Sequence, residues 1–117
     1  MVYITYYLAE GSTVAVFGCG AIGLGVIQTS GLVKASRIIA VDTNPNKKAW
    51  AIKMGATDFV NPMDLPEGKR IQDHLIDITD GGLDYTFDCT GNVSHIYIFS
   101  KLKITYLKPG QCYARST

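Results

Sequence analysis

The chain has 117 residues, which suffices for one domain with a buried core. Apolar residues make up 47% and charged residues 18%, the composition of an ordinary soluble globular domain, and the formal net charge of +1 excludes a global basic field for nucleic acid. No apolar run is long enough to predict a membrane span, and the N-terminus lacks the basic and long apolar segments of a signal peptide, so we expect a cytoplasmic protein.

The first predicted strand, about residues 12–17, leads directly into three glycines at Gly18, Gly20 and Gly23. Its near-continuous apolar character is typical of a parallel strand that helices cover on both faces. In a dinucleotide-binding turn, the first glycine permits the tight bend, the second lets a pyrophosphate approach the backbone, and the third lets the next helix pack closely on the strand. That helix is predicted over about residues 21–33, with its free N–H groups and positive dipole end facing the phosphates.

A second predicted strand, residues 37–41, ends at Asp42. Asp42 follows Gly23 by nineteen residues, near the usual spacing for a carboxylate that accepts hydrogen bonds from ribose hydroxyls. A dinucleotide site is therefore the preferred interpretation of the glycine turn. Two alternatives stay open: a plain strand-to-helix turn with incidental glycines, and another Rossmann-like nucleotide site such as that of a methyltransferase that binds S-adenosylmethionine.

Two further helices follow, each with apolar residues at helical spacing. The second helix, about residues 45–54, starts with Asn44 as N-cap and Pro45 at its first position and ends at Gly55; the third covers about residues 69–79. The side chains expected to face the sheet are Ile22, Val26 and Val33 in the first helix, Ala49, Ile52 and Met54 in the second, and Ile71, Leu75 and Ile78 in the third.

Two more strands are predicted in the same alternating order. A short one covers residues 58–60 and is ended by Asn61 and Pro62, and a longer one covers residues 83–89 after a turn at residues 80–82. This alternation of strands and helices argues for parallel βαβ units with right-handed crossovers.

The pattern weakens beyond residue 92. Residues 96–107 show both helical spacing and strand-like alternation, residues 108–110 form a turn, and residues 111–114 suggest a fifth strand. The predicted fold is a single α/β domain over residues 1–117. It is a Rossmann-type, doubly wound parallel sheet, truncated to about four or five strands, with helices on both faces.

The three cysteines, Cys19, Cys89 and Cys112, are far apart in the sequence and form no CxxC pair. We therefore expect buried or half-buried thiols, without a disulfide framework or a structural zinc site. His74 and His95 are similarly isolated, so no metal role is predicted for either.

Several motifs then occur in an order that is typical of one family. They are EGSTVAVFG at residues 10–18, ASRIIAVD at 35–42, MGATD at 54–58, DGGLDY at 80–85 and FDCTGNV at 87–93. Together they resemble the coenzyme domain of the zinc-dependent medium-chain alcohol dehydrogenases, above all class III, the S-(hydroxymethyl)glutathione or glutathione-dependent formaldehyde dehydrogenases. The resemblance covers about residues 10–93, whereas residues 1–9 and 94–117 lose the family pattern.

The resemblance implies NAD as the cofactor. Asp42 would hold the adenosine ribose and repel the extra phosphate of NADP, Lys47 would lie near that ribose, and Thr90 and Asn92 would flank the cofactor. A solvated lysine and ordinary turn residues stay open as the alternatives for these last three. The cofactor-binding residues that the resemblance implies are Gly18, Gly20, Ala21, Ile22, Gly23, Asp42, Lys47, Thr90 and Asn92.

The zinc ligands of this family lie in a catalytic domain to which no residue here corresponds. Catalytic zinc needs three protein ligands and an open fourth position, so we assign no catalytic residue and no metal ligand, and expect zinc only in the full-length family. The chain resembles a truncated piece of an oxidoreductase that binds NAD without turnover alone. The alternative is a non-enzymatic remnant that self-associates through an exposed sheet edge. No nucleic-acid or membrane partner is expected.

Overall fold

A computed structural model describes residues 10–79, 83–90 and 114–116. The turn predicted at residues 80–82 and the ambiguous segment at residues 96–107 lie outside the described residues. The elements, in chain order, are β1 (Thr13–Phe17), α2 (Ala21–Leu32), β2 (Arg37–Val41), α3 (Lys47–Met54), β3 (Asp58–Val60), a 3-10 helix (Pro62–Asp64), α4 (Ile71–Ile78), β4 (Tyr85–Asp88) and β5 (Ala114–Ser116).

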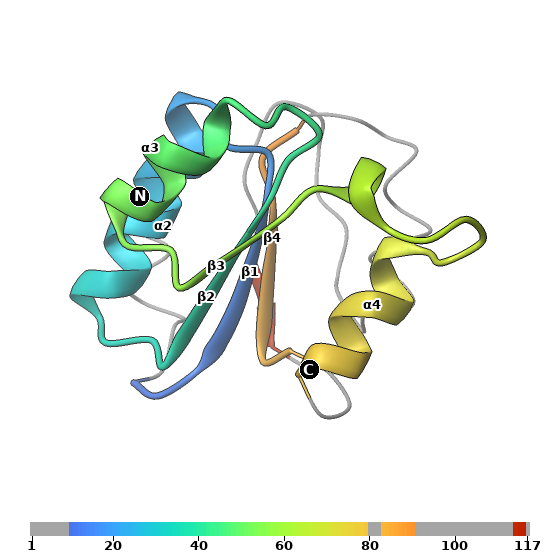
Figure 1. Cartoon of the computed structure of the whole chain (residues 1–117). Helices are drawn as coiled ribbons and strands as arrows, with labels where there is room; N and C mark the ends of the chain where they lie inside the picture. Colours follow the sequence, from blue (N-terminus) through green and yellow to red (C-terminus); the bar gives the residue numbers. More distant parts are fainter. Residues whose placement is uncertain (1–9, 80–82, 91–113, 117) are drawn as a thin grey trace.

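The strands form one sheet in the order β3-β2-β1-β4-β5. Strands β1 to β4 are all parallel, and the helices lie on both faces: α2 and α3 cover one face and α4 the other (Figure 1). This confirms the predicted α/β, Rossmann-type sheet. The fifth strand lies later than residues 111–114, overlapping that range only at Ala114, and it pairs antiparallel with β4.

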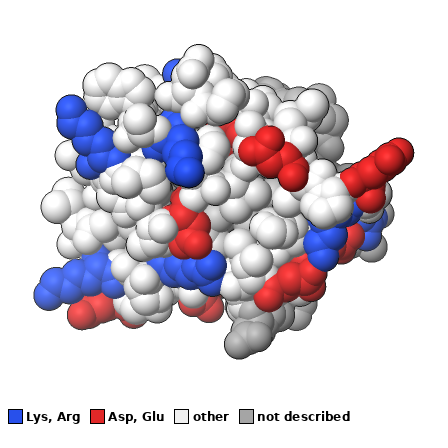
Figure 2. Space-filling view, viewed as in Figure 1, with Lys and Arg blue, Asp and Glu red and all other residues white. Residues whose placement is uncertain are grey.

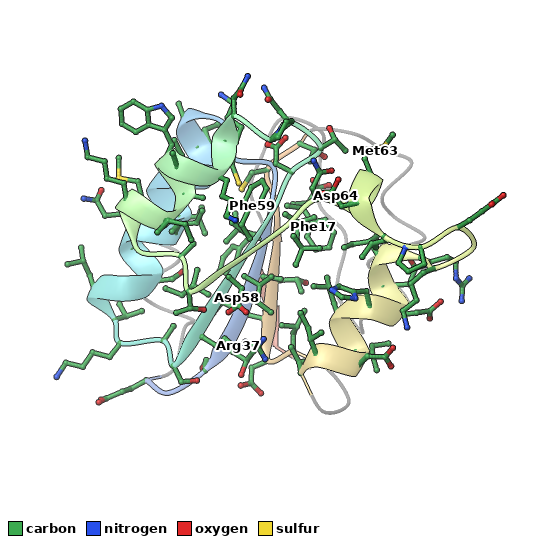
Figure 3. All side chains as sticks on the ribbon, viewed as in Figure 1. Phe17, Arg37, Asp58, Phe59, Met63 and Asp64 are labelled. Atoms are coloured by element: carbon green, nitrogen blue, oxygen red, sulfur yellow. The ribbon has the colours of Figure 1, made fainter. Side chains whose placement is uncertain are left out.

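Two apolar cores sandwich the sheet because successive strand residues point to opposite faces. Val14 and Val16 of β1 pack toward α2 and α3, and Ala15 and Phe17 pack toward α4. All four are buried. Because both faces of β1 are covered, the strand is apolar at nearly every position and does not alternate between apolar and polar residues. Figure 3 shows the same division: Phe17 lies on the α4 side of the sheet and Phe59 of β3 on the α3 side.

The inward faces of α2 and α3 differ in part from the sequence prediction. Val26 is buried and Val33 packs against the core, as predicted, but Ile22 is 53% exposed because the face that meets the sheet runs through Gly23 instead. In α3 the buried residue is Ala51, and Met54 packs against the core. The inward positions predicted for Ala49 and Ile52 are wrong; both are exposed.

The start of α3 also differs from the prediction: its N-cap is Asn46 and not Asn44. The side chain of Asn44 accepts a hydrogen bond from the N–H of Asn46 at 3.0 Å, and the N–H of Lys47 donates to the Asn44 carbonyl at 3.1 Å. These tight turns place the first α-helical residue at Lys47 rather than Pro45. The end at Gly55 is as predicted, with φ +120°.

Helix α4 was predicted correctly in its apolar face. Ile71 and Leu75 are buried and Ile78 packs against the same core. The helix is two residues shorter at its start and one at its end than the predicted range of 69–79. On the face of the molecule in Figure 2, basic and acidic side chains are interspersed among uncharged ones, so this face carries no continuous patch of one sign.

The amino ends of the strands are tied by an ion pair between Arg37 of β2 and Asp58 of β3. Two hydrogen bonds join the guanidinium to the carboxylate, at 3.1 Å and 3.0 Å, and a third runs from Arg37 to the Ile78 carbonyl (Figure 3). The hydrogen bonds from Arg37 hold the pKa of Asp58 below its usual value, against the opposing effect of partial burial. One side chain therefore links β2, β3 and the end of α4.

The Asp58→Asn substitution should lower the free energy of unfolding by about 1 kcal/mol at pH 7, because half-exposed charge-assisted hydrogen bonds contribute on that order. A lowered folded-state pKa stabilises the fold above the ordinary value of 3.8 and stops doing so as the pH falls below it. The difference between wild type and variant should therefore shrink from pH 7 to pH 3 in urea titrations. Asp64→Asn, an exposed acid of the 3-10 helix, is the control. A difference independent of pH would contradict this role of the ion pair.

Candidate functional site

The predicted glycine turn lies at the carboxyl ends of β1 and β4. Gly18 has φ +95° and its N–H donates to the Val41 carbonyl at 2.8 Å. A Cβ at Gly18 would come within 3.0 Å of the Cys89 carbonyl carbon and of the Thr90 methyl group. The chain thus leaves β1 in a left-handed conformation against the end of β4, and both facts favour glycine.

The third glycine is required by the approach of α2 to this turn. A Cβ at Gly23 would lie 1.7 Å from the carbonyl oxygen of Gly18, far inside the contact distance of any real pair of atoms. The close helix-to-strand packing predicted for Gly23 is confirmed. It places the N-terminus of α2 directly beyond the end of β1, at the edge of the sheet where α/β proteins bind ligands.

The second glycine faces open space. Gly20 is the N-cap of α2, its backbone is extended, and no atom lies within 4 Å of a Cβ built on it. No side chain caps the helix at this position, and Ala21 and Ile22 are exposed beside it. The first N–H groups of a helix have no partner within the helix, so this end of α2 offers donors and a positive dipole to an anion.

Asp42 lies next to the glycine turn, as its position after β2 predicted. One carboxylate oxygen accepts a hydrogen bond from the backbone N–H of Cys19 at 2.8 Å, and the other accepts one from the N–H of Asn44 at 2.8 Å. The side chain is half-buried. A carboxylate has lone pairs for about four hydrogen bonds, so these two contacts leave capacity for a ligand hydroxyl.

Lys47 and Thr90 were also predicted to lie at the cofactor. Lys47 is the first residue of α3, and its charge opposes the rise in the pKa of the Cys19 thiol. Thr90 lies beside Gly18 and donates through its N–H and hydroxyl to Asp88, at 3.0 Å and 2.6 Å. The predicted Asn92 lies outside the described residues.

Cys19 is a core residue and not a nucleophile. Its side chain is fully buried. Burial, and secondarily the charge of Asp42, raise the pKa of the thiol to about 12 against the opposing charge of Lys47, so it stays protonated at neutral pH. The expectation of a buried thiol is confirmed here. It is wrong for Cys89, which is in a disulfide, because distance along the sequence does not set distance in the fold.

Asn61 is a residue of this region whose role the sequence analysis missed. It is 8% exposed, its amide donates to the Thr43 carbonyl at 3.1 Å, and its oxygen accepts from the N–H of Met63 at 2.9 Å. It therefore holds the loop that follows β2. The signal available in the sequence was Asn before Pro62, which was interpreted only as the end of a strand.

The described residues contain neither a metal-binding cluster nor a helix that could span a membrane. Across residues 10–79, 83–90 and 114–116, no group of three or more His, Cys, Asp or Glu side chains is placed to hold a metal ion. In the same part of the chain, no helix has the length and apolar character needed to cross a bilayer.

Comparisons with known proteins by family model, by sequence and by structure lead to one family. The model of the zinc-binding dehydrogenase family matches residues 21–105. The chain is 61% identical to the S-(hydroxymethyl)glutathione dehydrogenase of Komagataella pastoris over 89 residues, which is 76% of this chain, and 55% identical to the class-3 alcohol dehydrogenase of Dictyostelium discoideum over 92 residues, which is 78% of it. It spans 24% of the length of either relative.

A solved structure agrees with this assignment. The crystal structure of 2R,3R-butanediol dehydrogenase from Bacillus subtilis superposes with a TM-score of 0.76 at 30% identity, covering 86% of this chain and 28% of that one. The fold and the sequence thus point to the same family.

Alanine at Gly23 should lower stability far more than alanine at Gly20. Gly23→Ala forces the helix and the turn apart and should lower the free energy of unfolding by about 3 kcal/mol. Gly20→Ala places a methyl group in open space and should cost no more than about 1 kcal/mol, the size of an N-cap effect. Urea denaturation followed by circular dichroism measures both. Equal losses would show that the close contact at Gly23 is not what the turn depends on.

Proposed function

Because the chain belongs to the zinc-binding dehydrogenase family, we propose that it binds NAD as the coenzyme-binding portion of an alcohol or S-(hydroxymethyl)glutathione dehydrogenase. The full-length enzyme would transfer a hydride from the alcohol carbon to the nicotinamide. In that reaction the cofactor supplies the redox chemistry, and this part of the protein supplies binding and orientation. The names of the relatives at 61% and 55% identity support this substrate class.

The observation that carries the proposal is the position of the Asp42 carboxylate against a glycine turn with room for a ligand. The diphosphate would lie over Gly20, where no atom is within 4 Å of a built Cβ, at the uncapped N-terminus of α2. The ribose hydroxyls would donate to Asp42. Removal of the open space or of the carboxylate should therefore remove binding.

The same carboxylate sets the preference between NAD and NADP. A 2′-phosphate on the adenosine ribose would place two negative charges beside Asp42, which is half-buried and so is poorly screened by water. We propose that NAD binds more tightly for this reason. Lys47 would lie near the adenosine ribose, and the exposed Ala21, Ile22 and Thr90, with Asn92, would complete the walls around the cofactor.

In this proposal zinc belongs to the full-length family, and this chain supplies the cofactor-binding part. The described residues hold no group of three or more His, Cys, Asp and Glu side chains that fits a metal ion. Family membership also favours a dehydrogenase over the alternative of a methyltransferase, which the glycine turn alone left open.

In calorimetric titrations the purified chain should bind NAD, should bind NADP more weakly and should not bind S-adenosylmethionine. Gly20→Val should abolish NAD binding with little change in melting temperature, because the side chain fills the ligand's space and not the protein's. Gly31→Ala is the matched control: it adds a side chain to the far end of the same helix, 4.0 Å from the Ile38 side chain, and should bind NAD like wild type. Tight binding of S-adenosylmethionine, or NAD binding unchanged in Gly20→Val, would refute the proposed site.

A further inference from the structure

We propose that Asp42 is a positioning residue for the diphosphate-binding turn, in addition to an acceptor for the ribose. The inference rests on the proposed NAD site, and it assigns to the carboxylate a second task inside the protein. Asp42 would fix the Cys19 peptide, and through it the shape of the turn from Gly18 to Gly20, before any ligand arrives. Its loss should then weaken binding of the diphosphate even for a ligand that has no ribose hydroxyls.

The geometry shows a carboxylate held from two sides. One oxygen accepts the N–H of Cys19 in the middle of the glycine turn, and the other accepts the N–H of Asn44 two residues after Asp42, both at 2.8 Å. The first bond joins segments 23 residues apart in the sequence, so it fastens the end of β2 to the turn that follows β1. Hydrogen bonds to an ionised acceptor are about twice as strong as neutral ones.

The turn needs such a fastening because two of its residues are glycines. Gly18 and Gly20 have the widest conformational freedom of any residue, and nothing lies within 4 Å of a Cβ at Gly20. Between them, Cys19 is anchored by its fully buried side chain and by the bond from its N–H to Asp42. Without that bond the peptide between Gly18 and Cys19 loses one of its restraints, and the donors for a phosphate are held less firmly in their directions.

The loop that carries Asp42 is itself fixed from β3. The N–H of Asp42 donates to the Val60 carbonyl at 3.2 Å, and the buried amide of Asn61 donates to the Thr43 carbonyl at 3.1 Å. The carboxylate therefore has a set position in the ligand-free protein. These hydrogen bonds and the bond from Cys19 to Asp42 therefore connect β3 to the turn after β1.

A nucleotide without ribose hydroxyls separates the two tasks, because they predict opposite changes in affinity when Asp42 is removed. If Asp42 served the ribose alone, its removal would take a negative charge away from the diphosphate, and 2′,3′-dideoxy-ADP would bind equally well or more tightly. If Asp42 also holds the turn, the same removal disorders the phosphate donors, and the dideoxy nucleotide binds more weakly.

The test uses the 117-residue chain with ADP and 2′,3′-dideoxy-ADP in calorimetric titrations. Asp42→Ala should weaken binding of 2′,3′-dideoxy-ADP about fivefold or more, the effect of one lost charge-assisted hydrogen bond after the relief of repulsion. Asp42→Asn keeps one oxygen acceptor and should restore part of the affinity. Asp84→Ala is the matched control, because Asp84 also accepts a backbone N–H, that of Thr13 at 2.9 Å, but at the opposite end of β1.

Hydrogen exchange of the Cys19 amide in the ligand-free chain gives an independent reading. Exchange should be slow in wild type and Asp84→Ala and much faster in Asp42→Ala. If Asp42→Ala binds 2′,3′-dideoxy-ADP as well as wild type does, the inference is overturned, whatever the exchange shows. If wild type binds neither nucleotide, the proposed function fails, and the exchange rates alone then decide whether Asp42 holds the turn. If Asp42→Ala does not fold, Asp42→Asn takes its place in both measurements.

Discussion

The contact that the rest of the structure depends on is the approach of α2 to the turn after β1. Only a glycine at position 23 leaves room for the Gly18 carbonyl, which would lie 1.7 Å from a Cβ there. This approach places the start of α2 over the carboxyl end of β1 and lets Val26 and Ile27 pack on the sheet. It also leaves the neighbouring Ile22 exposed at the rim of the site. One steric constraint thus fixes both the packing of the helix and the position of its anion-binding end.

The two ends of the parallel strands have different tasks. At the amino ends, Arg37 and Asp58 join β2, β3 and α4, and Asp84 accepts the N–H of Thr13. At the carboxyl ends, Asp42 makes a similar bond to Cys19, but beside open space at Gly20. The same chemistry, a carboxylate that accepts a backbone N–H, joins packed strands at one end and lies beside the proposed ligand site at the other. This division is the general expectation for open α/β sheets.

Much of this fold could be predicted from the sequence because the strands are nearly all apolar and glycine or proline marks their ends. β2 and β3 have the predicted bounds, and the roles of Gly18 and Gly23 follow from backbone geometry alone. Helix faces were predicted less well, since the apolar residues of α3 fit more than one face and the buried one is Ala51 rather than Ile52. The partners of Asp42 and Asn61 could not be predicted, because each bond joins residues brought together only by strand pairing.

Strand register explains why the site depends on the whole sheet and not on the glycine motif alone. In the β1–β2 pair, Phe17 lies opposite Val41, so the next residues, Gly18 and Asp42, leave the sheet side by side. A slip of one residue would carry Asp42 away from the Cys19 N–H and would also turn the apolar residues of β1 to the wrong faces. The burial of residues such as Val14 and Val16 therefore enforces the register that brings the carboxylate to the turn. The glycine-rich turn has an acid held beside it here because two apolar cores fix the register of the strands.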